Sequence, residues 1–288
     1  MPGRSARVGR PWTLLMAVPA SENGGSEQEQ GKTARSRQDE ARMNRRALFW
    51  VTHQLASWRP SPGVLAGVGG GAWLAVAVIT APAARHWYNR WGTTPAEAAG
   101  AMPGDDLIPH PKMASTRAVT IGAPPAEVWA WLAQIGQGRG GFYSYDVLEN
   151  LARCDIHSAG RIIPELQRLH RGDLIRLAPG QAPCFRVAIA EPPRVLVLAA
   201  ADPVTQAVRP MATTPDELGS TWQWLLRPVD GGRGTRLVAR QRYSYPARQS
   251  VMWHLVEPVS FVMERRMLHG IKARAETHAA AGLAGAAA

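Results

Sequence analysis

The sequence predicts an α+β fold, in which one strand and two short helices precede an antiparallel run of strands and a long C-terminal helix. Apolar and polar residues alternate in the segments 116–121, 220–229 and 235–245, which is typical of strands with one buried face. Residues 249–277 instead place apolar side chains at helical spacing. Because the strands follow one another without intervening helices, a doubly wound parallel sheet is excluded.

The N-terminal residues 1–46 predict a disordered basic tail. They are rich in Arg, Ser, Gln, Glu and Gly, and they hold no sustained apolar period beyond the short run Trp12–Val18. That run resembles the apolar core of a signal peptide, but the segment after it does not resemble a cleavage site. Translation from Met43 is an equally good expectation, which would make residues 1–42 an extension.

Residues 60–84 predict a single helix that spans or anchors in a membrane. The segment carries no Asp, Glu, Lys or Arg, and about 20 apolar residues suffice to cross the hydrocarbon core. Arg85, Trp87 and Tyr88 follow directly, and basic and aromatic side chains suit the headgroup boundary. Basic residues on the two sides nearly balance, so the orientation stays open. A buried or flexible Gly/Ala segment is the alternative.

The folded domain is expected to follow this helix after a linker. Residues 85–116 include several prolines and little periodicity, which favours a linker or an extended strap. The domain itself is predicted to span residues 117–278, and the Ala/Gly-rich end, residues 279–288, to be a disordered tail.

Within the domain, period and breakers predict each element in turn. The expected helices are 124–135 and 145–151, with a helical turn in the loop 160–173 and the long helix at the end. The expected strands share β-branched or alternating apolar residues between Pro/Gly turns: they are 116–121, 173–178, 184–192, 194–201, 220–229 and 235–245.

The glycine-rich stretch GQGRGGFYSYDVLEN fits the dinucleotide pattern G-x-G-x-x-G at Gly136, Gly138 and Gly141. A dinucleotide site needs a strand before the first glycine and a helix directly after the last one. Here a predicted helix precedes the glycines, so the stretch predicts a turn between two helices, where glycine lets backbone pack closely.

Charge and cysteine usage exclude several other functions. The net charge is +11, but residues 1–60 carry ten Lys and Arg against five Asp and Glu, so the basic excess is concentrated in the tail. No Lys/Arg cluster with interleaved aromatic residues predicts a nucleic-acid partner. Cys154 and Cys184 lack zinc-ligand spacing, although they could pair. His254 and Glu257 lie three residues apart without further ligands, so no metal and no cofactor are expected.

Three stretches resemble the SRPBCC superfamily, which includes START lipid-transfer, birch-pollen-allergen-like and polyketide cyclase/dehydrase-like proteins. They are TRAVTIGAPPAEVWAWLAQIGQGRGGFYSYDVLENL, IPELQRLHRGD, and TWQWLLRPV with GTRLVARQRY. The resemblance covers about residues 92–276 and is similar to an uncharacterised bacterial subgroup. It implies a helix-grip fold, a curved antiparallel sheet wrapped around the long C-terminal helix with an apolar cavity between them. Members bind lipids, sterols, polyketides or hormones, and some catalyse cyclisation or dehydration, but no catalytic motif is shared.

Aromatic and methionine side chains on the predicted sheet and helix are the candidate ligand-binding residues. In TWQWLLRPV two indoles and a leucine share one face, because side chains alternate across a strand. The terminal helix carries a stripe of apolar residues from Val251 to Met267. A paired arginine face on the last strand could meet a ligand carboxylate, or it could be a solvated outer face. The candidates are Trp129, Phe142, Tyr143, Trp222, Trp224, Arg240, Trp253, Met263 and Met267.

The densest polar cluster follows the glycines and supplies the candidate catalytic groups. It holds Tyr143, Tyr145, Asp146 and Glu149, where tyrosine and carboxylate groups could orient a ligand carbonyl or act as acid and base. His157 beside a carboxylate is a further candidate base. Three functions stay open: a membrane-tethered binder of an apolar small molecule or lipid, a cyclase or dehydratase that uses Tyr143, Tyr145, Asp146 or His157, and a non-catalytic scaffold.

Overall fold

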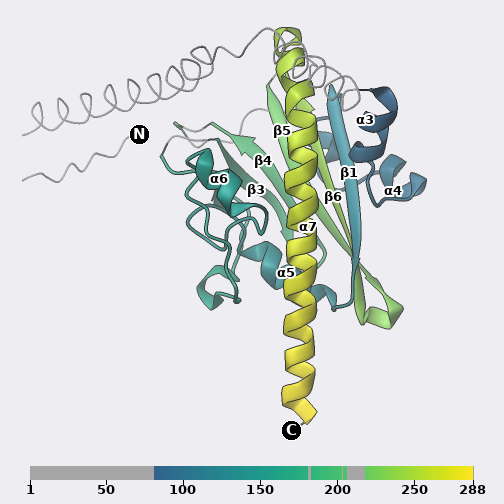
Figure 1. Ribbon diagram of the computed structural model, residues 1–288, viewed down its shortest axis with the longest axis vertical. Coiled ribbons are helices and arrows are strands. Elements are labelled where there is room, and N and C mark those ends of the chain that lie inside the picture. The colour runs from purple at the N-terminus through teal and green to yellow at the C-terminus, as the bar shows by residue number, and fades with distance from the viewer. Residues whose placement is uncertain (1–80, 181–182, 203, 206–217, 288) are drawn as a thin grey trace, which may run out of the picture. The chain divides into compact units, whose positions relative to one another are not determined.

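Six antiparallel strands form one sheet, with the order β1-β6-β5-β4-β3-β2 (Figure 1). The computed structural model describes residues 81–180, 183–202, 204–205 and 218–287, all within the unit 71–288. The strands are β1 (Met113–Ile121), β2 (Leu174–Arg176), β3 (Cys184–Glu191), β4 (Val195–Ala201), β5 (Gly219–Val229) and β6 (Gly234–Ser244). The predicted α+β class and all six predicted strands are confirmed.

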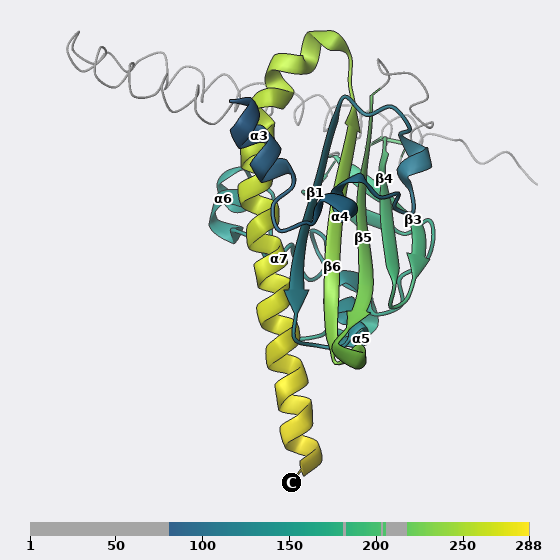
Figure 2. The ribbon, with the colours of Figure 1, turned by 90° about the vertical axis from the view of Figure 1, so that its right-hand side faces the viewer.

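Helices α5 and α7 cover one face of this sheet. The α-helices of the described residues are α3 (Pro82–Asn89), α4 (Pro95–Ala99), α5 (Pro125–Ala133), α6 (Asp146–Leu151) and α7 (Ser250–Ala287). The 3-10 turns there are η1 (Asp105–Leu107), η2 (Pro164–Leu166), η3 (Asp230–Gly232) and η4 (Ala247–Gln249). The main core includes Leu132 of α5, Leu237 of β6 and Leu268 of α7, all three fully buried. Figure 2 shows α4 in front of the sheet, on the face away from α5.

The hairpin between β5 and β6 sets the register of the two central strands. The residues DGG form η3 at its tip, and Gly231 and Gly232 both adopt positive φ, at 66° and 89°. Glycine takes this conformation without the steric cost of a Cβ. Trp222 therefore pairs with Gln241, and Trp224 pairs with Ala239. Both indoles point to the face that α7 covers, as the alternation in the sequence predicts.

Residues 85–116 are not a linker. Helix α4 begins with a capping box, in which Thr94 and Glu97 each accept from the other's backbone N–H. Glu97 pairs with Arg236 of β6, and Asp105 pairs with Arg240 of the same strand. Of the two alternatives that the sequence left open, these contacts fit the strap, and a local pattern could not decide between them because the contacts join residues more than 130 positions apart. The segment is a strap that covers the outer face of the sheet.

The C-terminal helix is longer than predicted, because α7 continues to Ala287 where residues 279–288 were expected to be disordered. Alanine has the highest helix propensity, which the composition argument for disorder neglected. Pro258 lies inside α7, as the sequence indicates, and the helix axis changes direction near its N-terminal end (Figure 2). The predicted apolar stripe of this helix is buried over only part of its length. Met267 is buried, whereas Val251 and Val259 are exposed.

The predicted membrane helix falls mostly outside the described residues. Residues 60–80 lie there, as does the tail 1–46, and the described part begins just before α3. Within the described part of the chain, none of the helices combines the length and the apolar character that a bilayer crossing requires.

Candidate functional site

A cavity of about 250 Å³ lies between the sheet and α7. Its apolar wall comes from five separate parts of the chain: the segment after α5, the loop after α6, the residue after β2, strand β5 and helix α7. The apolar lining residues are Phe142, Cys154, Ile156, Leu177, Trp222, Met263 and Met267, and the polar ones are Ser144, Glu149, Gln241, Ser260 and Glu264. The wall is thus mostly apolar with a few polar groups, which is the usual composition of a small-molecule site.

A second cavity of about 380 Å³ adjoins the first, because Leu177, Trp222 and Gln241 line both. It extends along β3 and β4 to the start of α7, where Trp253 stacks on Tyr245 at 5.3 Å between ring centroids. Together the two cavities follow the inner face of the sheet. A ligand longer than one ring system would therefore fit across Trp222.

A buried ion pair holds Trp222 in the wall. Arg117 of β1 forms a short ion pair with Glu264 of α7, and both side chains are almost completely buried. The other carboxylate oxygen of Glu264 accepts a hydrogen bond from Trp222 Nε1 at 2.7 Å. The Arg117 Nε donates to the carbonyl oxygen of Tyr88 at 2.9 Å. Because every partner is fixed by another, this network orients the indole ring that separates the two cavities.

The loop that carries Phe142 and Ser144 is positioned by the glycine-rich stretch. Gly136 and Gly141 form an isolated antiparallel bridge, both with positive φ, so this stretch is a turn between α5 and α6, as predicted. Arg139 closes the end of α5 by donating to the carbonyl oxygens of Ile135 and Ala133, at 3.1 and 2.9 Å. Helix C-terminal carbonyls need such donors. Burial lowers the pKa of Arg139, but the group makes these bonds as a cation.

Glu149 lines the first cavity with a half-buried carboxyl group. Its Oε1 accepts a short hydrogen bond from the Ser144 hydroxyl. Its Oε2 is buried and has no hydrogen-bond partner among the described residues. Burial raises the pKa of Glu149, and the nearby Asp146 carboxylate raises it further, while the bond from Ser144 lowers it. The net effect is a pKa above that of a free glutamate carboxyl group.

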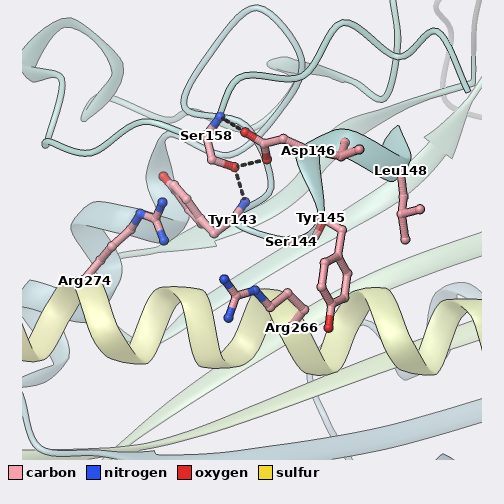
Figure 3. A pocket seen from close by; sticks show the side chains of 9 residues that line it. Tyr143, Ser144, Tyr145, Asp146, Leu148, Ser158, Arg266 and Arg274 are labelled. Carbon is pink, nitrogen blue, oxygen red and sulfur yellow. Dashed lines mark hydrogen bonds between the residues drawn. The ribbon is translucent and has the colours of Figure 1, made fainter. Parts of the chain in front are cut away.

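The predicted catalytic cluster lies in a different, more open cleft of about 370 Å³ between α6 and α7 (Figure 3). Tyr143, Tyr145 and Asp146 line it together with Arg266 and Arg274 of α7. Three of the four predicted acid–base candidates therefore lie together, but outside the apolar cavity.

Local bonds occupy most of these candidate groups. Asp146 accepts from both the backbone N–H and the hydroxyl of Ser158, at 2.7 and 2.6 Å. The Tyr143 hydroxyl donates to the carbonyl oxygen of Trp131, and burial raises the pKa of Tyr143 to about 12. His157 is exposed and contacts Asp155 at 3.2 Å. These contacts indicate a structural role for Asp146 and Tyr143. Both carboxylate oxygens of Asp146 and the hydroxyl group of Tyr143 already bond to protein atoms.

The other predicted ligand residues divide between cavity wall and core. Phe142, Met263 and Met267 line the first cavity, and Trp253 lines the second. The remaining ones do not line either cavity, and they are Trp129, Tyr143, Trp224 and Arg240. Trp129 and Trp224 belong to the core, and the Trp224 ring lies 4.6 Å from Trp222.

Arg240 lies on the outer face of the sheet, where the arginine pair was expected to be either ligand-binding or solvated. It is neither, because it donates to Asp105 at 2.7 Å and to the carbonyl oxygens of α4. Arg242 contacts the same carboxylate at 3.3 Å. The carboxylate that pairs with Arg240 and Arg242 is therefore that of Asp105 in the strap, and not that of a ligand.

Several cavity residues were missed by sequence reasoning. Leu177, Gln241, Ser260 and Glu264 come from elements that only the fold brings together. Glu149 was part of the predicted polar cluster but was not among the candidate site residues, because its spacing of three from Asp146 predicts only that the two side chains are neighbours on α6.

Metal and disulfide sites are absent from the described part of the chain. No group of three or more His, Cys, Asp or Glu side chains there could hold a metal ion. Cys154 and Cys184 do not form a disulfide with each other, so the pairing that the sequence left open does not occur. Glu257, which lies three residues from His254, accepts two hydrogen bonds of 2.7 Å from the Arg85 guanidinium group.

Comparison with known proteins assigns no family. No family model and no curated protein matches the chain. Among solved structures, CalU16 from Micromonospora echinospora aligns at 16% identity over 58% of this chain and 86% of that chain, with a TM-score of 0.26. DynU16, from the dynemicin biosynthetic locus, aligns at 15% identity over 55% and 47%, with a TM-score of 0.30. An HSP90 activator from Plasmodium falciparum aligns at 16% over 47% and 75%, with a TM-score of 0.28. Similarity this low assigns neither fold nor function.

Proposed function

We propose that this protein is a helix-grip domain of the SRPBCC type that binds an apolar small molecule or lipid between its sheet and α7. The observation that carries the proposal is the pair of adjoining cavities, of about 250 and 380 Å³, that meet at Trp222. Removal of apolar ligand surface from water contributes about 25 cal/mol per Å², so such a wall favours an apolar guest. Met263 and Met267 suit this role because methionine adapts to irregular shapes.

The test is ligand-dependent stability of the full-length chain. We expect tetralin or 1-tetralone, two small bicyclic probes, to raise the melting temperature, because a ligand that binds only the native state stabilises it by mass action. At ten times Kd the gain is about 1.4 kcal/mol, which corresponds to roughly 3–6 °C for a domain of this size. Mass spectrometry of the protein purified from cells should also detect a retained apolar molecule.

A matched pair of variants locates the ligand. Met263→Trp places a larger side chain in the cavity, whereas Val262→Trp makes the same kind of change at the neighbouring, exposed position. We expect the first variant to lose the ligand-induced stabilisation and the second to keep it. If no probe and no retained molecule is detected, or if both variants behave alike, the proposal fails.

The two alternatives receive less support. A cyclase or dehydratase that uses Tyr143, Tyr145, Asp146 or His157 needs two of these groups in the ligand cavity, and none of them lines it. A scaffold would fill its interior with its own side chains, which the two cavities argue against.

We further propose that the chain associates with a bilayer through residues 60–84 and through an exposed apolar surface on α3, α6 and α7. Helix α3 contacts the N-terminal half of α7 through the bonds of Arg85 and Tyr88 to Glu257 (Figure 2), and α6 borders the same cleft as α7 (Figure 3). Large exposed apolar side chains gather on these three elements: Trp87, Val147, Leu148, Leu151, Val251, Met252, Leu255, Val256, Val259 and Val262. An exposed apolar patch of this extent supports a membrane or protein contact, and the uncharged segment that precedes α3 favours the membrane.

Flotation with phosphatidylcholine vesicles tests this association. We expect the full-length chain to float with the vesicles, and a chain with Leu255→Glu and Val259→Glu to bind more weakly. Full-length protein that stays in the aqueous fraction would contradict the proposal. Deletion of residues 1–80 separates the contribution of the apolar segment from that of the exposed surface.

A further inference from the structure

Two arginines of α7 line the open cleft between α6 and α7. Arg266 and Arg274 are eight residues apart, slightly more than two helical turns, so they lie on the same side of the helix. Figure 3 shows both guanidinium groups directed from α7 towards the loop that carries Tyr143. Gly270 lies midway between them, where the Tyr143 backbone packs against α7. The cleft of about 370 Å³ therefore has a cation on each side of this contact.

Neither arginine is neutralised by a carboxylate of the described residues. No ion pair among these residues involves Arg266 or Arg274. Asp146 is the acidic residue in the cleft lining, and both of its oxygens already accept hydrogen bonds from Ser158. Two guanidinium groups and one carboxylate leave the lining with a net positive charge, which attracts an anion.

Aromatic rings orient the two guanidinium groups. The Cζ atom of Arg266 lies 5.6 Å from the centroid of the Tyr145 ring, and that of Arg274 lies 4.8 Å from the Tyr143 centroid. Arginine combines such ring contacts with a planar fork of N–H donors, which matches two oxygens of a phosphate group. Arg266 is exposed, and no hydrogen bond from its side chain is found within the described part of the chain. Its donors can therefore reach a ligand in the cleft.

An apolar rim beside the cations favours an amphiphilic anion over a fully polar one. Val147 and Leu148 of α6 line the same cleft, and their side chains are 81% and 51% exposed. Val262, four residues before Arg266 on α7, is exposed as well. These three residues belong to the apolar surface that is proposed to contact a bilayer. Basic and apolar side chains that share one surface are typical of helices that bind at the interface of an anionic membrane.

We propose that the cleft between α6 and α7 binds the phosphate group of an anionic phospholipid, with Arg266 as its main contact and Arg274 as the second cation. This inference rests on the proposed bilayer association and names the headgroup chemistry that it recognises. Phosphatidylcholine fits less well, because its choline cation would lie near two arginines. A soluble phosphate compound fits the charges but leaves the apolar rim uncovered.

Calorimetric titration of the full-length chain in dodecyl maltoside micelles tests the cleft without vesicle insertion. The ligands are dihexanoyl phosphatidylglycerol, dihexanoyl phosphatidylcholine and glycerophosphoglycerol, which is the headgroup of the first lipid without its acyl chains. The quantity compared is the ratio of the affinities for the two lipids, because the contribution of their identical acyl chains cancels. We expect the wild type to prefer phosphatidylglycerol at least about tenfold, the order of one charge-assisted hydrogen bond, and to bind glycerophosphoglycerol more weakly than the lipid.

A matched pair of charge-preserving variants distinguishes a phosphate site from general electrostatic attraction. Arg266→Lys and Arg233→Lys keep the same net charge, and both positions are exposed, with Arg233 at the tip of the hairpin between β5 and β6. We expect Arg266→Lys to lower the preference about fivefold, because lysine cannot form the bidentate pair. Arg233→Lys should leave the preference unchanged. Equal melting temperatures of the two variants verify that the fold is intact.

The outcomes separate this inference from the association on which it rests. If the full-length chain does not float with vesicles, the proposed bilayer association itself fails. If it floats but the two short-chain lipids bind equally, or both lysine variants keep the wild-type preference, the cleft assignment is wrong while the association stands. Glycerophosphoglycerol that binds as tightly as its lipid would point to a soluble phosphate compound and would overturn the lipid assignment.

Discussion

Two glycines in the same helix should respond oppositely to the same substitution. Gly270 of α7 lies against the backbone of Tyr143, so a methyl group built there would overlap the Tyr143 carbonyl oxygen and approach its Cβ to 2.9 Å. Gly282, also in α7, is exposed, and a methyl group there would meet no atom within 4 Å. The pair therefore tests whether α7 packs tightly on the loop that forms the cavity wall.

The expected magnitudes follow from two opposing effects. Replacement of a helical glycine by alanine stabilises the helix by about 1 kcal/mol. At Gly270 the overlap must be relieved by moving backbone, so the overpacking cost lies near the upper end of the usual range, about 3 kcal/mol. Gly270→Ala should therefore lower the free energy of unfolding by about 2 kcal/mol, whereas Gly282→Ala should raise it by about 0.5–1 kcal/mol.

Urea unfolding followed by tryptophan fluorescence measures both changes in free energy. In thermal unfolding, the Gly270 variant should melt about 4–8 °C lower than the wild type, and the Gly282 variant slightly higher. Gly270→Ala should also weaken probe binding, because Tyr143 lies between Phe142 and Ser144, which line the cavity. If Gly270→Ala stabilises the protein as much as Gly282→Ala does, the close contact between α7 and Tyr143 is refuted.

Three further substitutions probe other contacts. Glu264→Gln should cost about 3–5 kcal/mol in urea unfolding, because Arg117 stays behind as a buried unpaired charge, and a loss below about 1 kcal/mol would contradict this. Arg236 lowers the pKa of Glu97 to about 2, so the stability that this pair contributes is present above about pH 4.5 and is lost as pH falls towards about 2; Glu97→Gln should flatten that part of the stability-versus-pH curve. Gly141→Ala should destabilise by about 1–3 kcal/mol, because its φ is 73° and its methyl group would lie 2.8 Å from neighbouring backbone; unchanged stability would refute the strain.

The element order was predictable because its signals are local. Alternation over β5 and β6, the prolines before α5 and the glycines after it each act within a few residues, and the structure confirms the elements that they predict. The same locality left linker and strap undecided for the segment over the outer face, because its carboxylates meet Arg236 and Arg240 only in the folded chain.

The candidate site was predictable only in part, for the same reason. Aromatic and methionine side chains were expected to face the interior, and Trp222, Met263 and Met267 do line the cavity. Their pattern could not distinguish cavity wall from solid core, and Trp224, two residues from Trp222 on the same face, is packed in the core.

The sequence by itself determined which segments become strands and helices and which faces of them are apolar, because periodicity and breakers act along the chain. Only the tertiary structure decided which apolar face would enclose space and which polar groups would border it. Glu149, Gln241 and Glu264 come from α6, β6 and α7, and no spacing in the sequence relates them. Whether a buried carboxyl group finds a partner depends on three-dimensional packing, and at Glu149 that packing leaves Oε2 buried without a hydrogen-bond partner among the described residues.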